Sequence, residues 1–347
     1  MIPTLLAQGE GEWLQGEGPE SDVVMSTRIR LARNVQGYRF STRIEIGESQ
    51  ELLGFLREKI LSLPDRNFLW ADLRDLGPIE RQILVERHLI SREHAAGDGP
   101  RGVAVEPGEK LGIMVLEEDH LRLQVLISGL DVEKAWREMS ALSSGLAERI
   151  PFAWDERFGF LTACPTNVGT GLRVSAMLHL PGLVISRQIE KANQTAQKIH
   201  MAVRGLYGEG SRPASDLFQI SNQVTLGRTE ADLCAEFQEV VEKIVAWERE
   251  TRNQLLAERR TELEDQASRS LGILERARTM TSEEALQHLS RLRLGIHLGL
   301  VENLSLAKLN RIFLWVQPGH IQKEAGKALD PQERDILRAE KLRELMP

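Results

Sequence analysis

Residues 160–173, FLTACPTNVGTGLR, constrain the fold of this 347-residue chain more than any other segment. Pro165 fixes its own φ and favours an extended conformation for Cys164, the residue before it. Two close glycines then allow the backbone to pass near another group. From Arg173 to Leu180, apolar residues alternate with smaller or more polar ones, which is the period of a strand. The segment therefore predicts a rigid active-site turn that brings a thiol and a guanidinium together, although a plain turn beside a buried structural cysteine has the same local pattern.

The composition is that of an ordinary soluble globular protein, and the length allows two domains. Hydrophobic residues make up 41% and charged residues 27% of the chain, and the net charge of −7 argues against a nucleic-acid-binding surface. No apolar run is long enough to span a bilayer. With two cysteines and no recognisable export signal, we expect a cytoplasmic protein without a disulfide framework. The eight histidines are scattered, so the sequence predicts no metal site built from side chains.

Residues 22–34 begin the folded core, and a strand is predicted from Val24 onwards. In a strand, Arg28 and Arg30 lie on the same face because side chains alternate between the two faces. Two neighbouring cations repel each other unless an anion lies between them. The pair therefore indicates either an anion-binding site or two solvated surface arginines. Arg33 is expected to be a further surface charge.

The spacing of apolar residues predicts strands and helices in the rest of the chain. We expect strands or hairpins at 111–126, 173–180 and 218–226, and a strand that runs into a glycine loop at 201–211. We expect helices at 50–63, 78–88, 131–146 and from Thr229 onwards, with Asp131 and Thr229 as N-caps. The acidic turn of the 111–126 hairpin would ordinarily be solvated, but Arg122 lies among apolar residues and would then need a partner. Cys234 lies among apolar residues of the last helical region, where we expect it to be a buried packing residue.

Two motifs resemble those of the ATP:guanidino phosphotransferases, a family that includes creatine and arginine kinases. Residues 164–173, CPTNVGTGLR, closely resemble the active-site signature of that family, and residues 26–30, STRIR, match its first nucleotide-binding motif. The resemblance implies an α+β fold in which a largely antiparallel, glutamine-synthetase-like sheet is flanked by helices and followed by an all-helical C-terminal domain. It also implies ATP and Mg²⁺, with the metal ion held through the nucleotide.

Carried over residue by residue, the resemblance implies three catalytic residues, Glu118, Glu209 and Cys164. The implied nucleotide-binding residues are Ser26, Thr27, Arg28, Ile29, Arg30, His88, Arg122, Arg173, Val174, Ser175, Ala176, Met177, Arg204, Gly205, Leu206, Tyr207, Gly208 and Glu209. The sequence contains neither a P-loop nor the motif set of the protein kinases. Arginine side chains would therefore hold the triphosphate, since a guanidinium is always charged and bonds phosphate oxygens in a fork.

The chemistry of guanidino phosphorylation explains the carboxylates. A guanidinium is a poor nucleophile, because its pKa lies above ~12 and it has no lone pair to offer. Glu118 and Glu209 would clamp the group in plane, and one of them, left open by the sequence, would accept its proton. Cys164 would lie beside the same group as a thiolate, positioning it without forming a covalent intermediate.

Features at both ends of the chain resemble the bacterial protein-arginine kinases. Because the first nucleotide-binding motif begins at Ser26, we expect the chain to lack the helical domain that precedes it in metabolite-specific guanidino kinases. The open site that results would suit an arginine on a protein. We expect a catalytic domain at 1–255 and, at 256–347, a helical domain for oligomerisation and phosphoarginine sensing. Within it, four residues resemble an allosteric phosphoarginine pocket: Arg334, Asp335, Arg338 and Ala339. A solvated charged helix shows the same spacing.

The resemblance also implies biological partners. Members of this family mark proteins with accessible arginines for a Clp protease and regulate the stress response. They work with a small zinc-binding activator protein and form homodimers or larger oligomers, and neither a nucleic acid nor a membrane is expected as a partner. Two alternatives stay open: a kinase of free arginine or another small guanidino metabolite, and a catalytically inactive scaffold that reads phosphoarginine.

Overall fold

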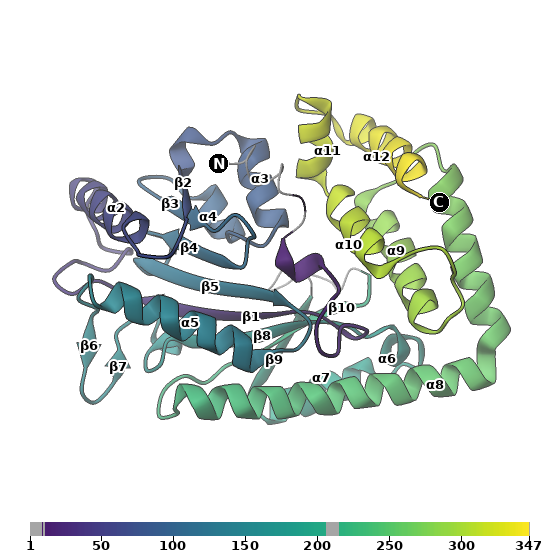
Figure 1. Cartoon of the computed structure of the whole chain (residues 1–347), viewed down its shortest axis with the longest axis horizontal. Helices are drawn as coiled ribbons and strands as arrows, with labels where there is room; N and C mark the ends of the chain where they lie inside the picture. Colours follow the sequence, from purple (N-terminus) through teal and green to yellow (C-terminus); the bar gives the residue numbers. More distant parts are fainter. Residues whose placement is uncertain (1–8, 10, 206–214, 347) are drawn as a thin grey trace.

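The computed structural model describes residues 9, 11–205 and 215–346, which contain one large sheet and a small β-ribbon. The strands are β1 Val24–Arg33, β2 Leu69–Asp72, β3 Gly102–Val105, β4 Leu111–Val115, β5 Leu121–Ser128, β6 Trp154–Asp155, β7 Gly159–Phe160, β8 Leu172–His179, β9 Met201–Gly205 and β10 Leu217–Asn222. Eight of them form the sheet in the order β2-β3-β4-β5-β1-β8-β10-β9, and each neighbouring pair is antiparallel. The ribbon consists of β6 and β7 (Figure 1).

Helices flank the sheet and form the C-terminal region. They are α2 Ile46–Leu61, α3 Pro78–Glu86, α4 Arg92–Ala96, α5 Val132–Ala147, α6 Pro181–Ile185, α7 Ile189–Lys198, α8 Glu230–Arg276, α9 Ser282–His297, α10 Leu306–Trp315, α11 Pro318–Ala325 and α12 Pro331–Leu345, with 3₁₀ turns η1 Glu12–Leu14, η2 Leu73–Asp75 and η3 Pro165–Asn167. Side-chain caps begin two of them as expected: Asp131 accepts from the Lys134 amide, and Thr229 accepts from the Asp232 amide. In the described part of the chain, no helix has the length and apolar character needed to cross a membrane.

The two faces of the sheet differ in polarity because side chains alternate along each strand. On β1, Ile29 and Leu31 are buried in the main core, which continues into α5 and α8 on that face. Arg28 and Arg30 alternate with them and therefore belong to the opposite face. Each fully buried aliphatic side chain of this kind stabilises the fold by roughly 1.5–3 kcal/mol. The expected α+β class, with a largely antiparallel sheet and a helical C-terminal region, is confirmed.

One helix joins the two regions of the molecule. Helix α8 is 47 residues long, and its one residue outside helical φ/ψ is Arg259, with φ −135° and ψ 30°. Figure 1 shows its first part running beneath the sheet and its second part turning towards α9–α12. A second core lies between these C-terminal helices and the sheet, and Trp13 of η1 is buried in it. The N-terminal turn therefore lies between the sheet and the C-terminal helices.

Two expectations need correction. The strand expected at 218–226 ends at Asn222, because Thr225 leaves the sheet to donate to the carbonyls of Thr166 and Val168. Arg33, expected to be a surface charge, is only 2% exposed. Cys234 is buried in the main core, as expected.

Candidate active site

The polar face of the sheet forms one wall of a cavity of about 930 Å³. Four arginines from three neighbouring strands line it: Arg28 and Arg30 on β1, Arg122 on β5 and Arg173 on β8. The register places Arg30 directly opposite Arg173. On the next strand, Gln219 accepts a hydrogen bond of 2.9 Å from Nη2 of Arg28. This set of cations is suited to a ligand that carries several negative charges.

Burial and mutual repulsion lower the pKa values of Arg28 and Arg30. Burial, together with the charges of Arg173 and Arg122, lowers the pKa of Arg28 to about 10. Burial also lowers the pKa of Arg30, and the charges of Arg28, Arg122 and Arg173 add to this effect. The Nε of Arg30 is buried and has no hydrogen-bond partner among the described residues. An anion in the cavity would offset the repulsion and give this donor a partner, so the arrangement fits a triphosphate.

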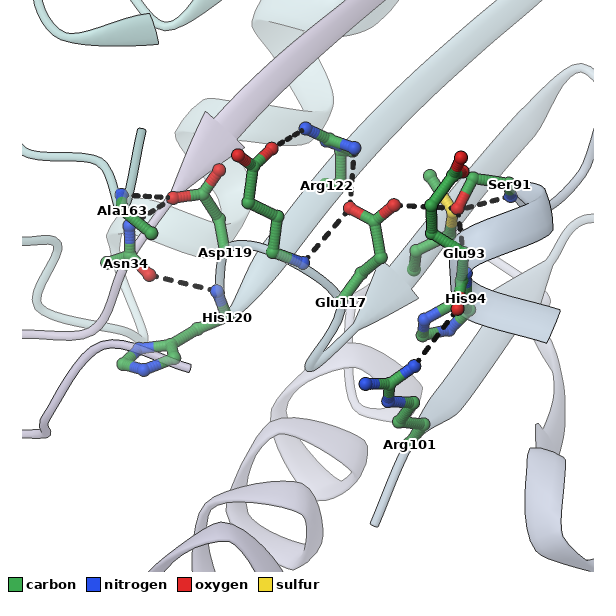
Figure 2. Close-up of polar contacts among 12 residues, drawn as sticks. Asn34, Ser91, Glu93, His94, Arg101, Glu117, Asp119, His120, Arg122 and Ala163 are labelled. Carbon is green, nitrogen blue, oxygen red and sulfur yellow. Dashed lines mark hydrogen bonds and ion pairs between the residues drawn. The ribbon is translucent and has the colours of Figure 1, made fainter. Parts of the chain in front are cut away.

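The acidic turn between β4 and β5 holds Arg122 (Figure 2). Nη1 of Arg122 donates to Glu117 at 2.5 Å, and Nη2 donates to Glu118 at 2.6 Å. Glu117 is nearly buried, whereas the Glu118 side chain is 39% exposed. Although burial disfavours the charged form, Arg122 and hydrogen bonds from Ser91 and the Glu118 amide hold the pKa of Glu117 below its ordinary value. Glu117 thus fixes Arg122, while Glu118 has room to bind a cationic group from a ligand.

The third acidic residue ties this turn to the cysteine loop. Asp119 is fully buried, and its Oδ1 accepts from Nδ2 of Asn34 at 2.7 Å and from the Ala163 amide at 2.8 Å (Figure 2). Ala163 immediately precedes Cys164, which also lines the cavity. The Asp119 contacts therefore fix the position of the thiol relative to Glu118.

The cysteine loop is held from several sides. The thiol of Cys164 lies 3.0 Å from the hydroxyl of Thr166, and the hydroxyl of Thr162 donates to the Cys164 carbonyl at 2.7 Å. Gly169 has φ 109°, and a Cβ there would lie 2.6 Å from the Thr225 carbonyl. Only glycine fits this position. The loop is thus a rigid element with its thiol at the cavity wall.

Arg33 joins the two ends of this loop. Its guanidinium carbon lies 3.4 Å from the centre of the Phe160 ring, and its Nη1 donates to the Thr170 carbonyl at 2.9 Å. Burial lowers the pKa of Arg33 to about 9, with Glu230 opposing the shift. A planar guanidinium can stack and donate in these directions at the same time, which an ammonium group cannot.

Arg33→Lys is therefore expected to loosen the loop. Losing a desolvated cation–π contact of about 2 kcal/mol should make amide hydrogen exchange at Phe160 and Gly169 about 30-fold faster. Mass-spectrometric exchange of peptides covering residues 158–171 measures this. Arg157→Lys is the matched control, because Arg157 stacks at 5.2 Å on the exposed ring of Phe158. Equal exchange in the two variants would show that Arg33 does not hold the loop.

His88 forms another part of the cavity wall, just beyond the end of α3. It has a φ of 57°, and its carbonyl accepts from Nε2 of Gln124 at 2.7 Å. Trp13 packs edge-on against its ring at 5.1 Å. Burial and the charge of Arg28 lower the pKa of His88 to about 3. A neutral imidazole can therefore pack against an uncharged ring system without adding another cation to the cavity.

Most of the other residues that were predicted to bind the nucleotide do not line the cavity. Ile29, Val174 and Ala176 are buried in the main core, and Met177 is buried in the second core. Three more are also buried: Ser26, Thr27 and Ser175. These seven belong to the strands that carry the cavity arginines and do not line the cavity. Arg204 and Gly205 lie on β9, where residue 204 is opposite Gln219. Leu206, Tyr207, Gly208 and Glu209 lie outside the described residues.

The C-terminal motif lies on α12, outside the cavity. Arg338 is 2% exposed and donates to the carbonyls of Val316 and Met280, each at 2.7 Å, and to Asp335 at 2.6 Å. Arg334 is partly exposed on the same helix, and Ala339 is fully buried. Arg338 therefore links α12 to the chain just before α11.

Several site residues were not expected from the sequence. Asn34, Ser91 and Glu117 make contacts between segments far apart in the chain, which no local pattern reports. Gln219 is different: the alternation of its strand could have placed it on the polar face. For Asp119, the sequence indicated only that the residue belongs to an acidic turn and did not indicate its buried contacts.

Comparisons with known proteins agree on one family. Residues 57–251 match the ATP:guanido phosphotransferase, C-terminal catalytic domain, and residues 260–347 match the protein-arginine kinase McsB C-terminal domain. The protein-arginine kinase of Symbiobacterium thermophilum is 43% identical over 344 residues, which cover 98% of this chain and 97% of that protein. That of Halothermothrix orenii is 44% identical over 340 residues, with coverages of 98% and 97%.

A solved structure supports the same assignment. The duplicated taurocyamine kinase from Schistosoma mansoni, with bound transition state analog components, superimposes with a TM-score of 0.62 at 25% identity. The match covers 67% of this chain and 34% of the duplicated kinase, so the chain spans about a third of that protein. Together with the near-full-length relatives, it shows that the chain belongs to the ATP:guanido phosphotransferases, in the branch of the protein-arginine kinases.

Proposed function

We propose that this chain is an ATP-dependent protein-arginine kinase, which transfers the γ-phosphoryl group of ATP to guanidinium groups of arginines in other proteins. The observation that carries this proposal is the cavity itself. Its arginines suit a triphosphate, and Glu118 beside them suits a guanidinium. Donor and acceptor would therefore meet at the boundary between the cationic and the acidic parts of one cavity.

The cavity arginines would bind the nucleotide. Arg28, Arg30, Arg122 and Arg173 would bond the phosphate oxygens and offset the charge that spreads over the transferred group. Mg²⁺, held through the phosphate oxygens, would neutralise part of the same charge. Arg204 and Gly205 on the edge strand β9, together with Leu206, Tyr207, Gly208 and Glu209, are proposed to complete this set.

The acidic side of the cavity would prepare the nucleophile. Glu118 and Glu209 would hold the substrate guanidinium in plane, close to the γ-phosphorus. As the nitrogen attacks, the bond from phosphorus to the bridging oxygen breaks, ADP leaves, and the proton of the nitrogen passes to a carboxylate. Cys164 would contact the guanidinium and help to orient it without forming a covalent bond.

The remaining proposals follow the family. We propose a catalytic domain at 1–255 and a C-terminal domain at 256–347 that supports oligomerisation. On α12, the phosphoarginine pocket would be formed by four residues: Arg334, Asp335, Arg338 and Ala339. The kinase would mark proteins for a Clp protease during stress, would work in the cytoplasm with a small zinc-binding activator, and would form a homodimer or larger oligomer.

The test is a comparison of two acceptors. The purified chain is incubated with Mg-ATP and either an unfolded arginine-rich protein or free L-arginine, and phosphorus NMR detects an acid-labile N–P product. We expect the signal on the protein and none on the free amino acid. The same protein with its arginines chemically blocked is the control and should give no signal. A signal on free arginine would favour a metabolite kinase, and no signal on either acceptor would contradict kinase activity.

A further inference from the structure

A buried carboxylate joins α3 to α11 of the C-terminal region. Glu86, the last residue of α3, accepts from the Gly319 amide at 2.7 Å and from the His320 amide at 3.2 Å. Nδ1 of His320 lies 2.8 Å from the same carboxylate. Both side chains are almost completely buried. Figure 1 shows the two helices side by side at the upper edge of the molecule.

The geometry of this contact admits little variation. A Cβ at position 319 would lie 2.8 Å from Oε2 of Glu86, so any other residue there would have to displace this buried carboxylate. The carboxylate caps the free amides at the first turn of α11, where the helix dipole favours a negative charge. A movement of α11 relative to α3 would therefore break several charge-assisted hydrogen bonds at once.

The α3 end of this contact lies next to residues that line the cavity. Arg87 follows Glu86 and is buried, with its Nε donating to Glu109 at 2.5 Å. The next residue, His88, lines the cavity in a left-handed backbone conformation. Val85 lines the cavity as well. The end of α3 is thus shared between the cavity wall and the contact with α11.

The α11 end of this contact is connected to the C-terminal motif on α12. Arg338 on α12 donates from Nε to the carbonyl of Val316, two residues before α11 begins. Burial lowers the pKa of Arg338, and the charge of Glu86 is one of those that oppose this shift. The position of α11 is therefore set jointly by Glu86 and Arg338.

We propose that Glu86 is a positioning residue that couples the C-terminal helices to the nucleotide side of the active site. Through it, the placement of α11 sets the orientation of His88 and hence the affinity for ATP. Binding linkage requires the reverse effect too, so nucleotide in the cavity stabilises the packing of α11 on α3. This inference rests on the proposed function, because it needs ATP to bind in this cavity.

The variant test uses Glu86→Gln in the full chain. Glutamine keeps the size of the side chain but lacks the charge that holds the α11 amides and His320. We expect the KM for ATP to rise about tenfold, within the usual range of coupled sites, while kcat at saturating ATP stays within about twofold. Glu80→Gln is the matched control, since Glu80 lies on the same helix and faces Lys323 of α11 at 4.0 Å from a more exposed position. A lowered melting temperature with an unchanged KM would show a merely structural role and overturn the proposal.

A second measurement needs no variant. Hydrogen exchange of peptides covering residues 318–325 is followed in the wild-type chain with and without a Mg-bound, non-hydrolysable ATP analogue. We expect about tenfold slower exchange when the analogue is bound. Calorimetry on the same sample shows whether the analogue binds. Binding without protection of α11 overturns the coupling alone, whereas no binding at all contradicts the proposed function.

Discussion

Replacing Glu118 with glutamine is expected to lower kcat for phosphorylation of a protein substrate about a thousandfold, since a positioned general base contributes ~10²–10⁴-fold. Glutamine has nearly the same shape but neither takes the proton of the attacking nitrogen nor pairs with a guanidinium. In the structure, Glu118 binds the guanidinium of Arg122 at 2.6 Å from a position that is 39% exposed. The carboxylate already contacts one guanidinium group and is accessible to a second. Initial rates at saturating Mg-ATP measure the effect.

Measuring the affinity of Glu118→Gln for a nucleotide shows whether the variant has lost only the chemical step or also the structure of the site. Because Arg28, Arg30 and Arg173 remain, the dissociation constant for a Mg-bound ATP analogue should change less than about fivefold in Glu118→Gln. Glu58→Gln serves as the control for the same chemical change at an exposed site, 72% exposed on α2, and should keep the wild-type rate. A kcat within tenfold of wild type, with binding intact, would assign the proton acceptor to another residue.

The largest effect on stability is expected from Glu248→Ala, which should lower the free energy of unfolding by about 3–5 kcal/mol. Glu248 is fully buried on α8, and it accepts from the amides of Gly182 and Leu183 at 2.8 and 2.9 Å. It also pairs with Arg252 at 2.6 Å. Alanine would leave a buried guanidinium without its carboxylate and two amides of α6 without an acceptor. Urea unfolding followed by circular dichroism measures the change.

The same helix offers a control with the same spacing. Glu239 and Lys243 also form an i,i+4 pair at 2.6 Å, but their side chains are 67% and 72% exposed. Water and salt screen such a pair, so Glu239→Ala should leave the unfolding midpoint unchanged within error. Similar midpoints for the two variants would contradict the assignment of Glu248 as a buried anchor. Burial, and not geometry, is the variable that this comparison isolates.

Much of the fold could be predicted because the spacing of apolar residues within a short segment determines whether that segment forms a strand or a helix. The strand predicted from Val24 is β1, and its alternation placed Arg28 and Arg30 on one face. Apolar arms around an acidic turn predicted the β4–β5 hairpin. The caps at Asp131 and Thr229 predicted where two helices begin. In each case the signal lies within a few residues of the element that it describes. Of the candidate site, the sequence predicted the cationic strands for the same reason.

The rest depends on contacts between distant segments. Arg33 was expected at the surface because it is charged, yet it follows Ile29 and Leu31 in the two-residue period of β1 and is buried, because Phe160 and Thr170 cover it from a loop more than a hundred residues away. Glu117 and Asp119 flank Glu118 in sequence, but they are held by Ser91 and Asn34. No local period encodes which side chain across the fold will meet a given carboxylate. These supporting residues therefore become visible only when the packing is known.

The central strand β1 has a consequence for how this protein can change in evolution. Its odd-numbered Ile29 and Leu31 belong to the core, and its even-numbered Arg28 and Arg30 belong to the cavity. Deleting or inserting one residue at its start would exchange the two sets, sending guanidinium groups into the core and aliphatic groups into the cavity. Folding and catalysis would fail together. Lineages can therefore vary this strand by substitution, whereas single-codon gains and losses should collect in the connecting loops.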